Sequence, residues 1–118
     1  MEQTFEIPGR FVSLNEFLDM HYHDRKTTKR EHDVRVACAA MAAGVRPCGR
    51  RITYHVHWVE ENRRRDLDNV AFAKKFIQDG LIKAGIISND THHEIAGFSD
   101  SFGYDSKNPR IIVTLKEE

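Results

Sequence analysis

Cysteine, proline and long apolar runs are scarce in this sequence, and their scarcity excludes several classes of protein. Of 118 residues, two are cysteine and three are proline. Cys38 and Cys48 lack CxxC or Cys/His spacing, so neither a zinc site nor a disulfide framework is expected. We expect Cys38 to be a small core residue. No apolar stretch reaches membrane-spanning length, and the first residues do not resemble a signal peptide, so we expect a cytoplasmic protein without membrane contact.

An excess of one charge is also missing. Eighteen basic and eighteen acidic residues give a net charge of zero, whereas most nucleic-acid-binding proteins are basic. The basic residues are nevertheless clustered. One cluster contains Arg25, Lys26, Lys29, Arg30 and Arg35, and another contains Arg46, Arg50, Arg51, Arg63, Arg64 and Arg65. The first cluster is interrupted by Glu31 and Asp33, which also fits an ordinary solvated helix face.

The apolar pattern predicts one α+β domain over residues 1–118, with β-α-β-α-β-β order, a mixed sheet and two main helices. Strands are predicted at 4–7, 51–59, 94–102 and 109–115, and the main helices at 28–43 and 70–84. A capping box, Ser13 to Glu16, predicts a short helix to residue 19. Residues 103–106 are expected to form a hairpin between the last two strands.

Two apolar rows define the expected core. On the strand at 51–59, Ile52, Tyr54, Val56 and Trp58 alternate with polar residues. On the first main helix, the residues expected to be buried are Val34, Ala37, Cys38, Met41 and Val45. The segment 60–65 is highly charged, and we expect it to be exposed.

The most informative motif is a run of arginines that leads directly into two aspartates. Arg63 to Arg65 precede Asp66 and Asp68. In an extended Asp-Leu-Asp segment both carboxylates point to one side, with Cα atoms about 7 Å apart, and can hold a Mg²⁺ ion together. Nearby arginines attract a polyanion, so the motif indicates phosphodiester cleavage in nucleic acid. Alternatively, one aspartate simply caps the helix that follows.

The motif resembles the RusA family of Holliday-junction resolvases. The resemblance covers residues 63–90: Arg-Arg-Asp-Leu-Asp-Asn at 64–69, a lysine-bearing helix, Lys-Ala-Gly at 83–85 and Asp90. A fainter resemblance covers Ser13-Leu14-Asn15. The family consists of small homodimeric endonucleases that nick four-way DNA junctions symmetrically and depend on Mg²⁺, for which Mn²⁺ is an alternative.

The resemblance implies roles for residues of this chain. Asp66, Asp68 and Asp90 would be the essential carboxylates, and a lysine on the helix would bind phosphate or act as a base. Well-known members have that lysine where this chain has Phe72. Counting back from the end of the helix favours Lys75, with Lys74 as the alternative. Where the family often has two acidic residues, only Asp90 carries over.

Chain geometry limits how the carboxylates can meet. A helix over 70–84 is about 22 Å long, and the five residues after it return at most about 17 Å. Asp90 therefore reaches the two other aspartates only if the chain doubles back at once, or if a two-fold axis brings in a second protomer. Asn69 would cap the helix or hydrogen-bond a carboxylate. The residues expected to bind DNA are Arg63, Arg64, Arg65, Asn15, Lys26, Lys29 and Arg30.

Together, the carboxylate motif and the resemblance to RusA predict a Mg²⁺-dependent junction-resolving nuclease, and two alternatives stay open. One is a weakly active or inactive DNA-binding or scaffold protein of the same fold, which the zero net charge favours. The other is a metal-dependent nucleotide hydrolase that shares the carboxylates. His55 and His57 are expected on a half-exposed strand face. His92 and His93 either contact phosphate beside Asp90 or lie in a solvated loop.

Overall fold

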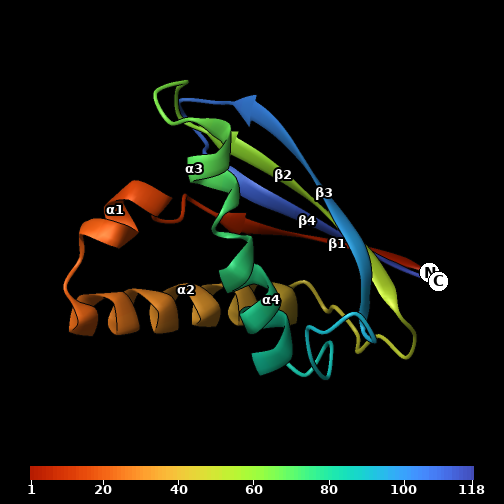
Figure 1. The fold of residues 1–118 in the computed structure, drawn as a ribbon. Coiled ribbons are helices and arrows are strands. Elements are labelled where there is room, and N and C mark those ends of the chain that lie inside the picture. The colour runs from red at the N-terminus through yellow and green to blue at the C-terminus, as the bar shows by residue number, and fades with distance from the viewer.

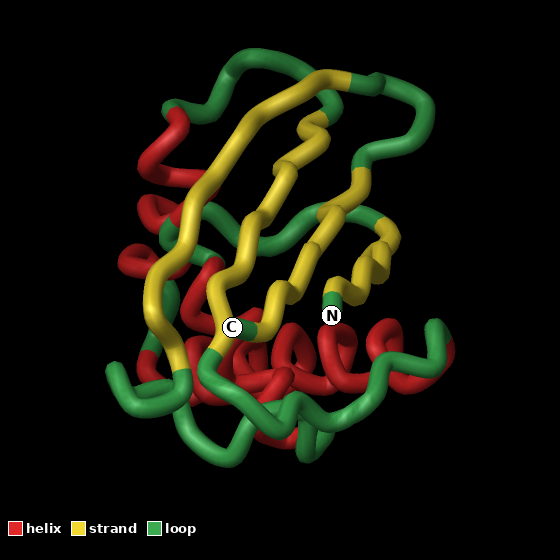
Figure 2. The backbone as a smooth tube through the Cα atoms, turned by 90° about the vertical axis from the view of Figure 1, so that its right-hand side faces the viewer, coloured by secondary structure: helices red, strands yellow, loops and turns green.

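A four-stranded sheet and a layer of helices on one of its faces make up the computed structural model, which describes all 118 residues. Figure 1 shows the helices on one side of the sheet, and Figure 2, turned so that the sheet lies in front of the helices, shows that the second face is open. The elements are β1 (Glu2–Pro8), α1 (Leu14–Asp19), α2 (Tyr22–Ala42), β2 (Ile52–Glu60), α3 (Leu67–Ala71), α4 (Lys74–Lys83), β3 (Ile95–Tyr104) and β4 (Arg110–Glu117). The predicted α+β class and mixed sheet are confirmed.

The strand order is β1-β4-β2-β3, and the predicted hairpin between the last two strands is wrong. β4 pairs antiparallel with both β1 and β2, whereas β3 pairs parallel with β2. A parallel pair needs a crossover, which α3 and α4 provide. β2 and β4 both carry a complete row of buried apolar residues and are the two central strands, while β3 carries Asp100 on the same face.

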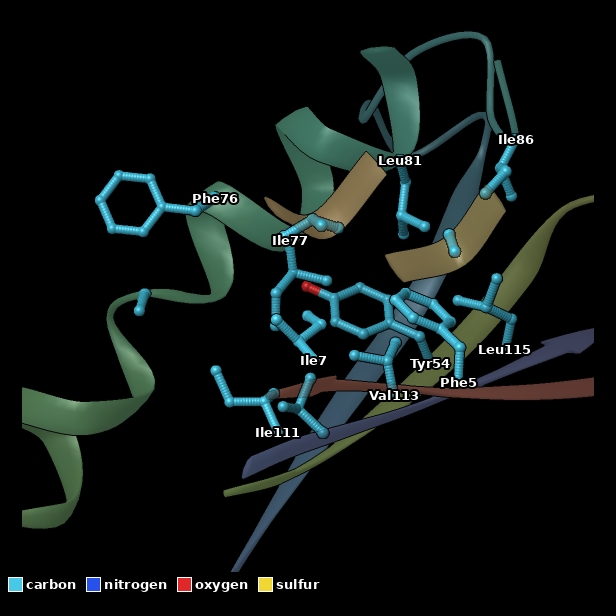
Figure 3. Packing of buried hydrophobic residues seen from close by; sticks show 14 of the residues in the cluster. Phe5, Ile7, Tyr54, Phe76, Ile77, Leu81, Ile86, Ile111, Val113 and Leu115 are labelled. Carbon is cyan, nitrogen blue, oxygen red and sulfur yellow. The ribbon is translucent and has the colours of Figure 1, made fainter. Parts of the chain in front are cut away.

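The core lies between the sheet and the helices α2 and α4. All four apolar residues predicted on β2 are buried: Ile52, Tyr54, Val56 and Trp58. Figure 3 shows Ile77 and Leu81 of α4 pointing down onto residues of the sheet such as Val113. None of the four helices has the length and apolar character that crossing a bilayer requires.

The buried face of α2 differs from the predicted one. The buried residues are Asp33, Val36, Ala37 and Ala40, whereas three residues predicted to be buried, Val34, Cys38 and Met41, are exposed. The reason is the close crossing with α4, which selects the face of α2 that carries small residues. The helix also begins earlier than predicted, at Tyr22.

Gly80 makes this close crossing possible. A Cβ atom at this position would lie 2.4 Å from Val36 Cβ and 2.8 Å from the carbonyl oxygen of Asp33. Glycine costs helix stability on its own. Here that cost is offset because no other residue lets the two helix backbones approach so closely.

The predicted helix over 70–84 is interrupted. α3 begins at Leu67, and Phe72 and Ala73 separate it from α4. The backbone tightens at the break, where the N–H of Lys75 donates to the carbonyl of Phe72 at 3.2 Å, an i to i+3 bond. Before α1 the predicted capping box is confirmed: the Ser13 hydroxyl accepts from the Glu16 N–H at 3.2 Å, and the Glu16 carboxylate accepts from the Ser13 N–H at 3.1 Å.

Candidate active site

Asp66 and Asp68 lie at the N-terminus of α3, and both are exposed. Asp66 is the N-cap residue by its backbone, but its side chain makes no capping hydrogen bond. Asp68 lies in the first helical turn, where its Oδ1 accepts from the N–H of Asn69 at 3.0 Å. The expected extended Asp-Leu-Asp segment is therefore wrong, because the helix starts at Leu67. Both carboxylates remain beside the positive end of the helix dipole, and the Asp66 side chain does not satisfy the helix end as a capping role requires.

The three arginines before this turn have different environments. Arg65 is half-buried, and its guanidinium donates to the carbonyl of Phe11 at 2.9 Å and to the Glu16 carboxylate at 2.5 Å. Arg63 lies over the ring of Tyr104 at 4.8 Å, and the side chain of Arg64 extends into solvent. Arg65 therefore fixes the loop to the start of α1, and Arg63 and Arg64 are the two that can reach a ligand.

The segment 60–65 is less exposed than predicted at its first residue. Glu60 is buried and accepts from the Arg10 guanidinium at 2.9 Å, with Arg65 at 3.5 Å. A buried carboxylate needs such partners because an isolated charge in the interior is costly. The ion pairs set where β2 ends and the arginine-rich loop begins.

Lys74 is held in a largely buried ion pair with Asp100 of β3. The carboxylate of Asp100 also accepts from the indole N–H of Trp58 at 2.9 Å. Lys74 Nζ lies 4.5 Å from the centre of the Phe98 ring. Asp100 was not among the predicted site residues, although the alternation Phe-Ser-Asp-Ser-Phe over 98–102 places a carboxylate on the same face as two aromatic rings.

Lys75 of α4 lies near Asp90 of the loop that follows the helix. Its side chain is 60% exposed, with Nζ 3.2 Å from Asp79 Oδ1 and 3.7 Å from Asp90 Oδ2. The loop after α4 therefore brings the Asp90 carboxylate to the side of this helix. Asp90 does not join Asp66 and Asp68 in a metal site, because no group of three or more potential metal ligands forms.

Asp66 and Asp68 are the two carboxylates at the start of α3 that could hold a Mg²⁺ ion. Mg²⁺ in enzymes is often held by one or two carboxylates, with water and substrate phosphate oxygens completing the shell. Asp66 and Asp68 supply two such groups at an exposed helix start. Asp90 pairs with Lys75 instead of joining them, so the expected three-carboxylate cluster is not formed within one protomer.

The first basic cluster gains a member from another part of the sequence. Lys26, Lys29, Arg30 and Asp33 of α2 line a surface hollow together with Lys83 at the end of α4. Lys29 pairs with Asp33 at 2.6 Å and with Asp79 at 3.0 Å. Burial alone would lower the pKa of Lys29, but these two carboxylates outweigh it and raise the pKa. Burial raises the pKa of Asp33. Lys26, Arg30 and Lys83 are the cations free for phosphate.

Asn15 lies in the first turn of α1, exposed, on a helix that contacts α3. The rings of Phe17 and Phe72 are 5.7 Å apart and hold these two short helices together. This packing brings the faintly resembling Ser13-Leu14-Asn15 segment to the side of the molecule that carries Asp66. Sequence spacing alone could not show this proximity.

The surroundings of the four histidines indicate no role in binding metal or phosphate. His55 and His57 lie on the open sheet face, hydrogen-bonded to Ser99 and Ser101 of β3 at 2.6 to 2.7 Å. The rings of His92 and His93 are 4.2 Å apart on the surface. None of the four belongs to a group of three or more potential metal ligands.

No protein-family model matches this chain, and no curated protein matches its sequence. The resemblance to RusA resolvases therefore remains a prediction from the motif over 63–90. A function for this protein therefore has to be inferred from the geometry and chemistry of a few residues: Asp66, Asp68, Lys75 and Asp90.

Proposed function

We propose that the protein is a Mg²⁺-dependent, structure-specific DNA endonuclease that acts in the cytoplasm and resolves four-way junctions by paired nicks. The observation that carries the proposal is the helix start at Asp66. Two exposed carboxylates without basic partners lie in the same short segment as Arg63 and Arg64, the two arginines that can reach a ligand. Carboxylates and arginines in this order suit a site that holds a divalent cation and attracts a polyanion.

Each residue has a defined task in this proposal. Asp66 and Asp68 would hold the metal ion, which when bound supplies Lewis-acid activation of the phosphate and of a water molecule. Arg63 and Arg64 bind the DNA backbone and orient the scissile phosphate. Lys75, exposed and within one turn of the break after α3, neutralises charge that develops on the phosphate oxygens.

The exposure of the carboxylates supports a large substrate. Both lie on the surface at a helix end, and the basic hollow formed by Lys26, Arg30 and Lys83 extends the set of phosphate contacts along α2. Nicking two symmetry-related strands of a junction requires two sites related by a two-fold axis, so a homodimer is part of the proposal.

A DNA-binding protein without catalysis is the second candidate. The observation in its favour is the Lys75–Asp90 pair, which keeps the third carboxylate away from Asp66 and Asp68. Such a protein would bind junctions through the same arginines and would not cleave them.

Cleavage of a synthetic four-way junction separates these candidates. The purified protein is incubated with a labelled junction, and with a linear duplex of the same sequence, in Mg²⁺ or in EDTA. We expect symmetric paired nicks in the junction, in Mg²⁺ only. Binding without nicks would favour the second candidate, and equal cutting of both DNAs would contradict junction specificity.

A further inference from the structure

β3 is an edge strand without the features that normally protect an edge. The order β1-β4-β2-β3 leaves β1 and β3 with one unpaired side each, and proteins usually protect such edges with charges or proline. β1 follows this rule with Glu2, Glu6 and Pro8. β3 has ten residues without lysine or proline, and Lys74 neutralises its one charged side chain, Asp100.

Two exposed aromatic rings flank this free edge. Phe98 is 55% exposed and Tyr104 is 41% exposed, and among the strand residues they are the large apolar side chains most open to solvent. They are six residues apart on a strand, so both point to the helix side of the sheet. Phe98 covers the ammonium group of Lys74, and Arg63 lies over Tyr104.

We infer that β3 pairs antiparallel with β3 of a second copy of this chain, with Ser101 opposite the partner's Ser101. A bulge at the start of β3 shifts the register between Ile52 and Thr53 of β2, so the regular edge runs from Gly97 to Tyr104. A two-fold axis perpendicular to the sheet places residues of the same face opposite each other. The two-fold axis must therefore lie level with a residue of β3, and not midway between two residues, because neighbouring residues point to opposite faces.

Two positions of the axis are central to this edge, one at Asp100 and one at Ser101. Charge and shape favour the axis at Ser101. An axis at Asp100 would place two carboxylates opposite each other, which is destabilising. An axis at Ser101 places Phe98 opposite the partner's Tyr104 at both ends of the pairing, and covers both exposed rings. On the open face Ser99 then lies opposite the partner's Gly103, which has no side chain to clash with it.

The pairing also relates the two candidate sites by symmetry. The partner's Arg63, which stacks on the partner's Tyr104, would lie beside Phe98 of the first protomer. The two arginine-rich loops would then be related by the two-fold axis that paired nicking needs. The interface does not depend on the proposed nuclease activity, because cross-linking measures it without DNA or metal.

Disulfide formation at single introduced cysteines tests the register. In a Cys38→Ser, Cys48→Ser background, S101C is expected to form a disulfide-linked dimer at micromolar concentration under mild oxidation, since opposed residues have the Cα separation that a disulfide needs. S99C is the matched control on the same face. It lies about 13 Å along the strand from its partner copy in this register and should stay monomeric on a non-reducing gel. T27C, at an exposed position on α2, measures how much disulfide-linked dimer forms through random collisions.

Sedimentation of the unmodified chain tests the dimer itself. We expect a dimer at micromolar concentration that Phe98→Lys converts to a monomer with unchanged circular dichroism, because the added cation would face the partner's Arg63. Val34→Lys, an exposed control on α2, should remain dimeric. Preferential cross-linking of S99C would overturn the register, and a monomeric unmodified chain without S101C cross-links would overturn the interface. Neither result decides the proposed function, which the nicking assay tests separately.

Discussion

Two neighbouring lysines show how the environment of a residue decides its role. Lys74 and Lys75 are adjacent in the sequence, yet their side chains are 15% and 60% exposed. Lys74 neutralises the partly buried Asp100, whereas Lys75 lies at the surface near Asp90. We therefore infer that Lys74 stabilises the fold and Lys75 is available to a phosphate group.

Alanine substitutions should separate the two roles. Lys74→Ala leaves Asp100 partly buried without its cation, so the free energy of unfolding should fall by about 1–3 kcal/mol. Lys75→Ala should change stability little, because exposed ion pairs contribute less than about 1 kcal/mol, but should reduce junction nicking by orders of magnitude. Urea denaturation and single-turnover nicking measure the two effects. The reverse pattern would assign the phosphate-binding role to Lys74.

His32 should make stability depend on pH. Its Nε2 accepts from the Val12 N–H at 3.1 Å, and its ring stacks on Phe11 at 4.5 Å. Burial, assisted by the nearby Arg35, lowers the pKa of His32 from 6.5 to about 4. Between these values the unfolded chain binds the extra proton, so stability should fall as the pH drops from 6.5 toward 4, by up to about 3 kcal/mol.

Urea denaturation across this pH range measures the effect, and His32→Phe is the control. Carboxylates also titrate near the lower end, so the informative quantity is the difference between the two proteins. The His32→Phe variant should lose less stability on acidification. Parallel pH profiles for both proteins would show that His32 is not held in the neutral form.

At the scale of elements, local signals predicted more than long-range ones. The capping box at Ser13, the apolar row of β2 and the left-handed Gly85 that ends α4, with φ +74°, all follow from neighbouring residues. The position of β4 between β1 and β2 depends on pairing with distant strands, and no local signal encodes it. The buried face of α2 depends on Gly80, which lies 44 residues after Val36.

The candidate site was predictable to the same degree. The motif Asp66-Leu67-Asp68 and the candidate lysine Lys75 could be identified from the sequence. The pairing of Lys75 with Asp90 could not, because it depends on the path of the loop after α4. The start of α3 at Leu67 could not, because Asp66 adopts the N-cap conformation without a capping side-chain bond. Asp100 was missed because its importance comes from Trp58 and Lys74, which only the folded chain brings to it.

Gly80→Ala tests the crossing of α2 and α4. Helix propensity alone predicts stabilisation by about 1 kcal/mol, whereas the clash with Val36 predicts a net loss of about 1–3 kcal/mol. We expect the loss, measured by chemical denaturation. Gly49→Ala is the control, because nothing lies within 4 Å of its added Cβ. A stabilised Gly80→Ala protein would show that the helices are further apart than described.

For the whole molecule, zero net charge means that local patches must provide DNA affinity. Replacing Arg63 and Arg64 with Gln should weaken junction binding and flatten its salt dependence, by roughly 0.9 log units per log unit of salt for each phosphate that the variant no longer neutralises. Both side chains are exposed, so the fold should be retained. Fluorescence anisotropy over a salt series measures the slope. Arg50→Gln is the control, because Arg50 lies before the start of β2, whereas Arg63 and Arg64 lie after its end. An unchanged slope in the double variant would show that the DNA binds elsewhere on the protein.

The measurement that tests the proposed function most directly is made on Asp68→Asn. Asparagine is tolerated at a helix start and Asp68 is exposed, so the variant should fold, while losing a carboxylate that would hold the metal and repel phosphate. Nicking of a four-way junction in Mg²⁺ and affinity for the same junction are measured on one preparation. We predict that nicking is abolished while binding is unchanged or tighter. Full nicking by the folded variant would contradict the assignment of this carboxylate to the active site.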